Sequence, residues 1–364
     1  MASTDTTTLE AARAGDENAF AQLVQPYRTE LPAHCSRMLG SVYAAEAALQ
    51  DALLRAWKGL KRCEGRSSLR SWLYTIATNT CLNQIQRRPK RILPLDHGPA
   101  TDPHTGPGEP LVESVWIEPY PDEQLALPDG PAGPEARYEQ RESIELAFIV
   151  ALQHLPATQR AVLILREVLG FSAAEVAEAL DTTVASVNSA LQRARKAVEE
   201  RVPEQSQQAT LRSLGDGELR DLVDTYVDAW ERNDVDTVAA MLAEDAAISM
   251  PPLASWFGPR DEFARFLALW PLSGAWQWKT VQTTANGQPA IGFYAWDEEA
   301  RTHLPFALNV LTFRGDKITD VVAFAVRSIE PEEREKYHRW VDQPADEKRL
   351  VGTFERFGLP AQLD

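Results

Sequence analysis

The stretch GFSAAEVAEALDTTVASVNSALQRARKAV, residues 170–198, has the pattern of two helices joined by a tight turn. Ser172 and Glu175 form an S-x-x-E capping box, which is typical of the first turn of a helix. The sequence DTT then breaks the helical pattern, and Thr182 or Thr183 can cap a second helix. In that helix, apolar residues at a 4-3-4 spacing predict a buried stripe, namely Val187, Leu191, Ala194 and Val198. The stretch therefore predicts a helix-turn-helix.

The opposite face of the second helix is polar and suits DNA. Amide, hydroxyl and cationic side chains can bond base edges and phosphates in a major groove. The alternative is an ordinary helical hairpin with a solvated polar face, since short look-alikes of this motif are common. The candidate DNA-contacting residues are Ser186, Asn188, Ser189, Gln192, Arg193 and Lys196.

A second candidate DNA-binding segment, SLRSWLYTIATNTCLNQIQRRPKR, occupies residues 68–91. An amide stripe at i, i+4 and i+7 (Asn79, Asn83 and Gln86) leads into a cluster of arginines and lysine. Such a stripe suits phosphate tracking and base contacts. A solvated helix end favoured by the helix dipole is the alternative interpretation of the cluster.

The formal net charge of −16 over 364 residues is unevenly distributed. Residues 1–95 carry +5 and residues 141–201 carry −1, whereas residues 96–140 carry −9 and residues 202–364 carry −11. Exposed charges more than about 8–10 Å apart are largely screened, so the local charge of a face governs nucleic-acid binding. The acidic total therefore does not exclude DNA binding by the helical segments.

Composition and periodicity divide the chain into five parts. Residues 9–91 and 138–201 are predicted helical blocks. Residues 92–137, rich in Pro, Gly and Asp, are expected to form a linker, because such a composition buries too little apolar surface to offset its ordering entropy. Residues 208–328 begin with helical spacing and continue with strand-like alternation in WQWKTVQTT, AIGFYAWD, FALNVLTF and ITDVVAFAV. Residues 329–364 form a charged tail. The expected fold class is multidomain, with two all-α domains followed by an α+β domain.

Metal and membrane signals are weak. Cys35, Cys63 and Cys81 lack CxxC spacing, so neither a disulfide framework nor a zinc site is expected. With no nucleotide-binding loop either, we expect no metal and no cofactor. The chain shows no signal peptide and no run of eighteen apolar residues, so we expect a soluble, cytoplasmic protein that does not bind membranes.

The two helical blocks resemble the extracytoplasmic-function (ECF) sigma factors of bacteria. AFAQLVQPYRTELPAHCSRMLG, QDALLRAWKGL and LRSWLYTIATNTCLNQIQRR are similar to the family's region 2, and residues 151–198 are similar to its region 4. The resemblance implies that region 2 binds the clamp of RNA polymerase core and reads the single-stranded −10 promoter element. Region 4 is implied to bind the polymerase flap and read the −35 element.

The resemblance also assigns candidate residues. The loop Gly65-Arg66-Ser67-Ser68 matches the loop that captures a flipped −10 base, for which a pocket beside a melting surface makes physical sense. The −10 candidates are Arg66, Ser67, Ser68, Asn79, Asn83, Arg87 and Arg88. The polymerase-binding candidates are Glu46, Gln50, Asp51 and Arg55.

Two departures from the family pattern alter these expectations. The usually acidic polymerase-binding segment has few carboxylates in residues 44–51. The family's V-R-S-R-L is replaced by Val187-Asn188-Ser189-Ala190-Leu191, so arginines that could bond guanine are absent at residues 188 and 190. Asn188 would instead favour adenine, which predicts an altered −35 preference.

The C-terminal part resembles SnoaL-like domains of the NTF2 superfamily, in which helices and a curved sheet enclose a pocket. The resemblance implies that this domain modulates sigma activity in cis, through a small-molecule ligand or an intramolecular contact. Aromatic residues on half-buried strands are also ordinary core residues. The candidate pocket residues are Tyr226, Trp230, Met250, Trp256, Trp276, Trp278 and Tyr294, together with Phe263 and Phe306.

The sequence of this domain shows no acidic and basic side chains positioned to act together in catalysis, so we do not expect an enzyme. Two other functions stay open. One is a ligand-sensing helix-turn-helix regulator that does not bind polymerase. The other is a SnoaL-like enzyme with a DNA-binding appendage.

Overall fold

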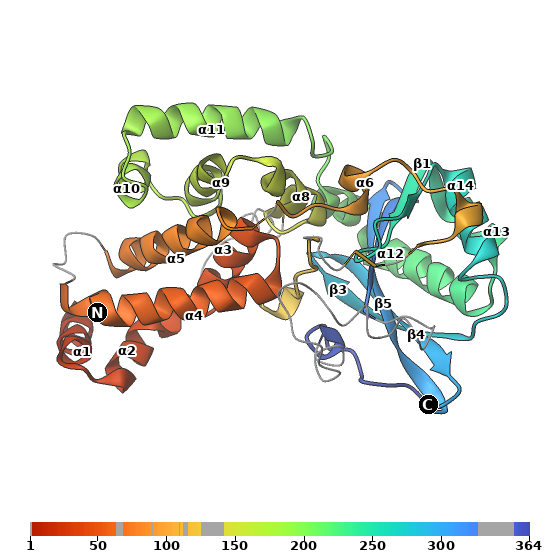
Figure 1. The fold of residues 1–364 in the computed structure, drawn as a ribbon, viewed down its shortest axis with the longest axis horizontal. Helices are drawn as coiled ribbons and strands as arrows, with labels where there is room; N and C mark the ends of the chain where they lie inside the picture. Colours follow the sequence, from red (N-terminus) through yellow and green to blue (C-terminus); the bar gives the residue numbers. More distant parts are fainter. Residues whose placement is uncertain are drawn as a thin grey trace. The chain divides into compact units, whose positions relative to one another are not determined.

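The computed structural model describes residues 2–62, 68–88, 90–108, 110–111, 116–124, 142–326 and 353–364 (Figure 1). The chain divides into two compact units. The first comprises Met1–Lys90, Gln124–Ser143 and Ala147–Val202. The second comprises Arg91–Glu123, Ile144–Leu146 and Pro203–Asp364.

The described part of the first unit consists of helices and the loops between them (Figure 1). Several helices begin at side-chain caps, because Asp16, Ser41 and Ser68 accept backbone N–H groups of the first turn. The helices of the N-terminal block are α1 (Ala2–Ala14), α2 (Glu17–Val24), η1 (Gln25–Tyr27), α3 (Glu30–Leu39), α4 (Val42–Gly59), η2 (Leu60–Arg62) and α5 (Leu69–Ile85). Those of the second block are α8 (Leu146–His154), α9 (Ala157–Leu163), the π-helical turn η5 (Ile164–Val168), α10 (Ala173–Ala179) and α11 (Val184–Glu199).

The helix-turn-helix forms as its sequence predicts. Ser172 and Glu175 make both hydrogen bonds of the capping box at the start of α10. Thr183 caps α11 by accepting the N–H of Ser186 at 3.1 Å. The predicted stripe is buried, with Val187 and Ala194 fully enclosed and Leu191 and Val198 each under a tenth exposed.

A buried arginine joins the two helical blocks of the first unit. Arg160 on α9, 4% exposed, donates from Nη1 to the Met38 carbonyl at the end of α3 and to Gln153 Oε1, both at 2.5 Å. Its Nη2 donates to the Gln153 carbonyl oxygen at 3.0 Å. The Gln153 side chain in turn donates from Nε2 to the Arg37 carbonyl oxygen of α3 at 3.0 Å. Gly40, with φ of 66°, is needed here because a Cβ atom would lie 2.9 Å from the Gln153 side chain. Arg160 therefore fixes the C-terminal end of α3 to α8 and α9.

The second unit is built on a six-stranded sheet with the order β2-β1-β6-β5-β4-β3. Its strands are β1 (Leu242–Ser249), β2 (Trp256–Phe257), β3 (Trp278–Ala285), β4 (Gln288–Asp297), β5 (Thr302–Arg314) and β6 (Lys317–Ala325). Its main helices are α12 (Gln207–Glu231), α13 (Val235–Met241) and α14 (Arg260–Leu269). Pairing is antiparallel except between β1 and β6, which are parallel. The apolar residues of these helices and of the sheet form one core, as Trp230 of α12 against Phe293 of β4 illustrates (4.7 Å between ring centroids).

The four strands predicted from alternation are confirmed as β3 to β6, but β1 was not anticipated. The sequence indicates helical spacing at the start of this domain and places the first strand at WQWKTVQTT, whereas β1 already begins at Leu242. The acidic pair Glu244 and Asp245 interrupts the alternation of this strand, which hides it in the sequence.

The segment after the first helical block differs from the expectation of a linker that buries little. Residues 92–108 and 116–123 belong to the second unit, where Trp116, Ile117 and Tyr120 are buried. The prediction is therefore wrong for these described residues, because a few aromatic and aliphatic side chains among the prolines and acids supply enough apolar surface to pack. We call the described residues of 92–123 the strap.

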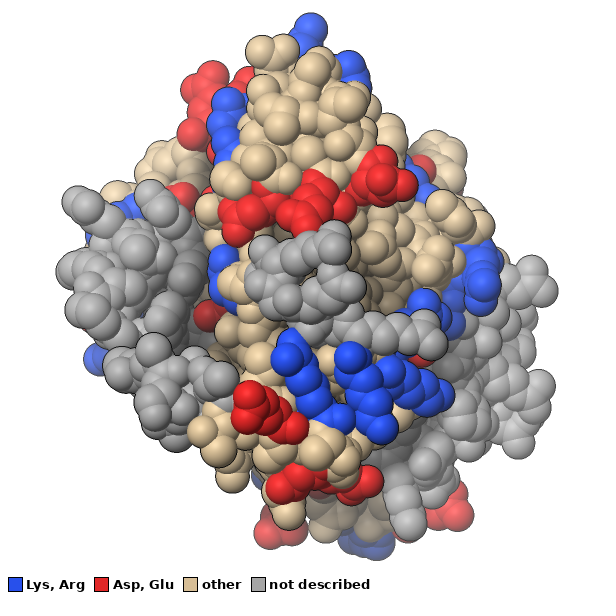
Figure 2. Space-filling view, turned by 90° about the vertical axis from the view of Figure 1, so that its left-hand side faces the viewer, with Lys and Arg blue, Asp and Glu red and all other residues tan. Residues whose placement is uncertain are grey.

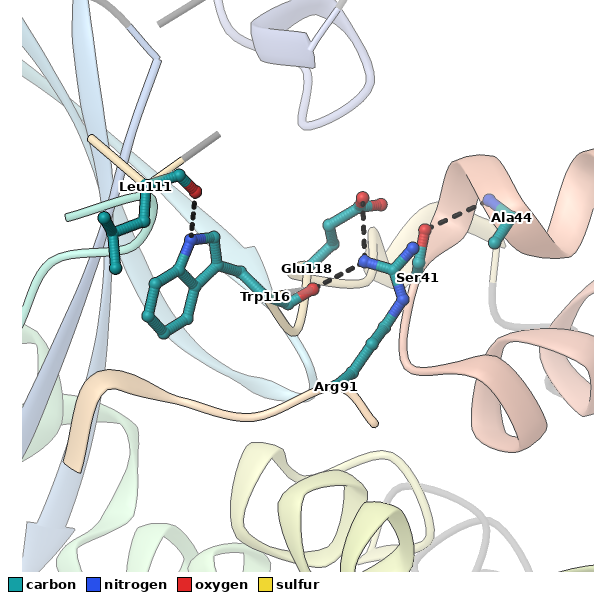
Figure 3. Close-up of polar contacts among 6 residues, drawn as sticks. All are labelled: Ser41, Ala44, Arg91, Leu111, Trp116 and Glu118. Carbon is teal, nitrogen blue, oxygen red and sulfur yellow. Dashed lines mark hydrogen bonds and ion pairs between the residues drawn. The ribbon is translucent and has the colours of Figure 1, made fainter. Parts of the chain in front are cut away.

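Polar contacts hold the strap in a defined conformation (Figure 3). Arg91 donates to the carbonyl oxygen of Trp116 at 2.6 Å, and its guanidinium lies 3.6 Å from the Glu118 carboxylate. Trp116 Nε1 donates to the carbonyl oxygen of Leu111 at 3.3 Å. Further along the strap, the backbone N–H of Thr101 donates to the carbonyl oxygen of Trp256 in β2 at 2.8 Å.

The end of the predicted charged tail also packs. Residues 353–364 lie against the sheet, where Phe354 contacts Tyr294 and Leu359 is buried. Gly292 of β4 leaves room for this segment, since a Cβ atom there would lie 2.6 Å from Leu359. Residues 327–352 lie outside the described residues.

The turn between β3 and β4 bonds both the end of the strap and the segment just before α8. Asn286 is fully buried with φ of 56°; its Oδ1 accepts the N–H of Tyr120 at 2.9 Å and its Nδ2 donates to the Ile144 carbonyl oxygen at 2.8 Å. We expect Asn286→Gly to keep the left-handed conformation and remove both bonds, at about 1–3 kcal/mol for each buried group left unpaired. The strap should then be cleaved faster in limited proteolysis.

Asn233→Gly is the matched control, because Asn233 also has φ of 56° and makes no side-chain hydrogen bond to the strap. Equal cleavage of the two variants would show that Asn286 does not hold the strap.

Candidate nucleic-acid interface and ligand pocket

The polar face of α11 is solvent-exposed. Asn188, Ser189, Gln192 and Arg193 are all exposed, and Lys196 reaches only a distant ion pair with Glu200 at 4.0 Å. Ser186 is exposed but accepts a hydrogen bond from the Thr183 hydroxyl at 2.9 Å, so it supports the cap. The helix therefore presents a continuous row of donors and acceptors at the spacing of a groove-binding helix.

The two departures from the family pattern differ in exposure. Ala190 is 7% exposed and lies on the inner face of α11 with Leu191, whereas Asn188 lies on the exposed face.

A hollow of about 410 Å³ lies between α4 and α5. It brings together two sets of candidates that the sequence assigned to different partners. Asn83, Arg87 and Arg88 come from the end of α5, and Asp51 and Arg55 come from α4. Asp51 and Arg55 form an ion pair at 2.8 Å that raises the pKa of Arg55 through a side-chain hydrogen bond.

Figure 2 shows a cluster of Lys and Arg side chains in the lower centre of one face, with Asp and Glu side chains in a band above it and in smaller groups beside and below it. A local basic cluster is thus present on a chain of net charge −16.

Helix α5 contacts the helix-turn-helix. Asn79 Nδ2 donates to the Ala179 carbonyl oxygen of α10 at 3.3 Å, and the Ser71 hydroxyl donates to Glu175 at 3.1 Å. The Arg70 guanidinium lies over the Phe171 ring at 4.4 Å. Asn79 is therefore engaged within the protein in this conformation, whereas Asn83 is exposed without such a contact to α10.

Of the remaining −10 candidates, only Ser68 is among the described residues. Ser68 is exposed and caps α5 through Ser71, while Arg66 and Ser67 lie outside the described residues.

The candidate polymerase-binding face on α4 contains an exposed apolar residue that the sequence analysis did not single out. Leu54 is 57% exposed, next to Arg55 and one turn after Gln50 and Asp51. Glu46 is half-buried and Gln50 is exposed. A single exposed leucine is common on protein surfaces, so only its position beside the candidate polymerase-binding residues makes it a candidate contact.

The second unit contains a partly open cavity of about 360 Å³ lined by the sheet, the helices and the strap. Nine residues are predicted to line a pocket. Of the first seven, from Tyr226 to Tyr294, four line this cavity: Trp230, Met250, Trp276 and Trp278. Phe306 also lines it. Tyr226 lies just behind Trp230, with 6.0 Å between their ring centroids, and Phe263 is fully buried in the core.

Two candidate pocket residues lie elsewhere. Trp256 donates from Nε1 to the Gly98 carbonyl oxygen at 2.8 Å and so holds the strap. Tyr294 points to the other face of the sheet, where its hydroxyl donates to the Pro360 carbonyl oxygen at 2.8 Å. Alternation along β4 separates Tyr294 from its pocket-lining neighbour Phe293.

Sequence reasoning missed many of the lining residues, among them Trp270 and Phe293, and two of the omissions are informative. Asn309 on β5 lines the cavity, and its signal was a lone amide in the otherwise apolar FALNVLTF. Residues 105–108 of the strap line it too, and nothing in their sequence indicates a pocket wall. Among the described residues, no group of His, Cys, Asp and Glu is placed to hold a metal ion. No described helix is long and apolar enough to cross a membrane.

The fold and these surfaces define a class: a DNA-binding protein with two helical modules and a pocketed α+β domain. Comparison with known proteins identifies each part. The Sigma-70 region 2 model matches residues 23–91, the Sigma-70 region 4 model matches residues 145–198, and the SnoaL-like domain model matches residues 223–321.

The ECF RNA polymerase sigma factor SigG of Mycobacterium tuberculosis is 40% identical over 321 residues, which cover 88% of this chain and 84% of the relative. The ECF RNA polymerase sigma-E factor of Escherichia coli is 29% identical over 55% of this chain and 94% of its own length. The crystal structure of the Mycobacterium tuberculosis ECF sigma factor SigJ has the same fold, with a TM-score of 0.50 at 19% identity over 91% of this chain and all of that one. The chain belongs to the ECF sigma factors, proteins that direct promoter-specific initiation of transcription, and it carries a C-terminal SnoaL-like domain.

Proposed function

We propose that this protein binds RNA polymerase core through α4 and reads promoter DNA with α5 and α11. The observation that carries the proposal is the exposed row on α11 together with the exposed amide and arginines at the end of α5. These are two separate surfaces of the residue types that bond bases and phosphates. Helix α4 supplies a mixed apolar and charged face for the polymerase clamp, made of Gln50, Asp51, Leu54 and Arg55.

Co-elution with core polymerase tests the polymerase part of the proposal. A sigma factor should co-elute with core enzyme in gel filtration, and Leu54→Glu should weaken that association. Leu111→Glu is the control, since Leu111 is also an exposed apolar residue but lies on the strap. A protein that binds DNA but never co-elutes with core polymerase would instead be a ligand-sensing regulator.

Asn188 is proposed to read a base of the −35 element. We expect Asn188→Ala to flatten the base preference at one position and to lower affinity for the preferred sequence by about 1–3 kcal/mol, or roughly 5-fold to 150-fold. Lys196→Ala should instead weaken all sequences alike and reduce the slope of log affinity against log salt by about 1. Binding selection from a randomised −35 element measures both. An unchanged base preference in the Asn188 variant would contradict the assignment.

The C-terminal domain is proposed to regulate sigma activity in cis by holding the strap. The strap connects region 2 to region 4, and its described residues pack into the same unit as the SnoaL-like domain. The conformation of a connector limits how two DNA-reading modules reach their elements. No Asp, Glu, His, Lys or Cys is among the described residues that line the pocket, which supports a binding role rather than acid–base catalysis.

A further inference from the structure

An exposed apolar side chain begins the second helix of the helix-turn-helix. Val184 is the first residue of α11 and is 44% exposed, the one large apolar side chain of the described helix-turn-helix that faces solvent to this extent. It does not belong to the buried stripe, which Val187 begins. A single exposed apolar residue is ordinary on a protein surface, so the significance of Val184 depends on where it lies in the motif.

Val184 lies on the turn that meets the bases in this kind of motif. The recognition helix of a helix-turn-helix enters the major groove, and its N-terminal residues contact base edges. Val184 and Asn188 are four residues apart on α11, so their side chains are neighbours on one face of the helix. Both are exposed. A duplex that contacts Asn188 therefore contacts Val184 as well.

The polar side chains of this first turn are already engaged in the helix cap. The Thr183 hydroxyl accepts the N–H of Ser186 at 3.1 Å and donates to the Ser186 hydroxyl oxygen at 2.9 Å. The other two exposed side chains of the turn, Val184 and Ala185, are apolar. The first turn of α11 therefore presents a mainly apolar surface to a base pair.

The chemistry of the major groove determines what such a surface can recognise. The apolar group that base pairs display there is the C5 methyl of thymine, whereas the other groups read in this groove are hydrogen-bond donors and acceptors. A valine that covers a donor or acceptor removes it from water without giving it a partner, which is unfavourable. A valine against a methyl group instead takes apolar surface out of water on both sides.

We propose that Val184 contacts the C5 methyl of a thymine in the −35 element and selects that base pair without a hydrogen bond. Four residues of helix rise about 6 Å, or about two base-pair steps, so this thymine lies within about two base pairs of the base that Asn188 reads. Val184 can act in this way only if α11 reads the −35 element, so the assignment rests on the proposed function.

Replacement of thymine by deoxyuridine tests the contact, because it removes the methyl and leaves the Watson–Crick edge unchanged. Each thymine on both strands of the selected −35 element is replaced in turn, and binding by the complex of core polymerase with the full-length protein is measured. In the wild type, one replacement near the position that Asn188→Ala flattens should lower affinity by about fourfold, the effect of one methyl group returned to water. In Val184→Ala, the same replacement should leave affinity unchanged.

Two features of the variants make the comparison specific. Alanine forms helices more readily than valine, so α11 should keep its fold in Val184→Ala. Leu269→Ala is the matched control, because Leu269 is 43% exposed but lies on α14 in the second unit, and this variant should respond to deoxyuridine like the wild type.

The outcomes separate this assignment from the proposed function. Sequence-specific −35 binding that no deoxyuridine weakens, or a deoxyuridine effect that persists in Val184→Ala, overturns the role of Val184 and leaves promoter reading by α11 intact. Binding without any preference among −35 sequences overturns both.

Discussion

Arg87→Glu combined with Arg88→Glu is expected to lower the affinity of the polymerase–protein complex for promoter DNA by at least about a hundredfold. Both arginines are exposed at the end of α5 and line the hollow that also contains Asn83. Each phosphate contact releases counterions, so the loss of two cations and the gain of two anions removes attraction and adds repulsion. Open-complex formation should fall with affinity, and the dependence of affinity on salt should become less steep.

Arg220→Glu combined with Arg232→Glu is the control for net charge. Both residues are exposed on or next to α12 in the second unit, and the charge change is the same. This variant should retain most of the wild-type affinity. Equal losses in the two variants would mean that total charge, rather than the end of α5, governs DNA binding.

Arg160→Met is expected to lower the free energy of opening in the first unit by about 1–3 kcal/mol for each buried carbonyl group that it leaves unpaired. The variant removes a buried guanidinium and leaves the Met38, Gln153 and Leu155 carbonyl groups without their donor. Burial lowers the pKa of Arg160 to about 10, so the group remains protonated at neutral pH. Native-state hydrogen exchange of the α8 and α9 amides measures this change.

Arg160→Lys should recover little of the loss, because an ammonium cannot reproduce the planar fork of bonds. Arg201→Met, at an exposed position, should change stability by no more than about 0.5 kcal/mol. Unchanged protection of α8 and α9 in Arg160→Met would show that this arginine does not hold the two helical blocks together.

Local signals in the sequence were sufficient for the helix-turn-helix and for four strands. Three features of the helix-turn-helix depend only on neighbours a few residues away: the capping box at Ser172, the cap at Thr183 and the apolar stripe on α11. Each of them is present in the structure. Region 2 and region 4 were identified because their motifs are long and ordered. These features needed no knowledge of tertiary contacts.

The features that sequence reasoning missed depend on distant partners. In the sequence, Arg160 looks like one more surface cation, because its acceptor at the end of α3 is far away along the chain. In the sequence the strap looks like an open linker, but in the structure Trp116 and Tyr120 are buried within the second unit. Tyr294 and Trp256 fit an aromatic pocket by residue type, but strand alternation and the path of the strap place them elsewhere. Residue type alone does not say which side of a sheet a ring faces.

Run-off transcription with purified core polymerase tests the central claim most directly. The full-length protein, added to core enzyme and a panel of genomic promoter fragments, should yield transcripts with defined start sites that core enzyme alone does not make. Arg87→Glu combined with Arg88→Glu should abolish those transcripts, and Asn188→Ala should reduce them according to the −35 sequence. A complete panel without protein-dependent transcripts, or transcripts that are indifferent to both variants, would contradict the account.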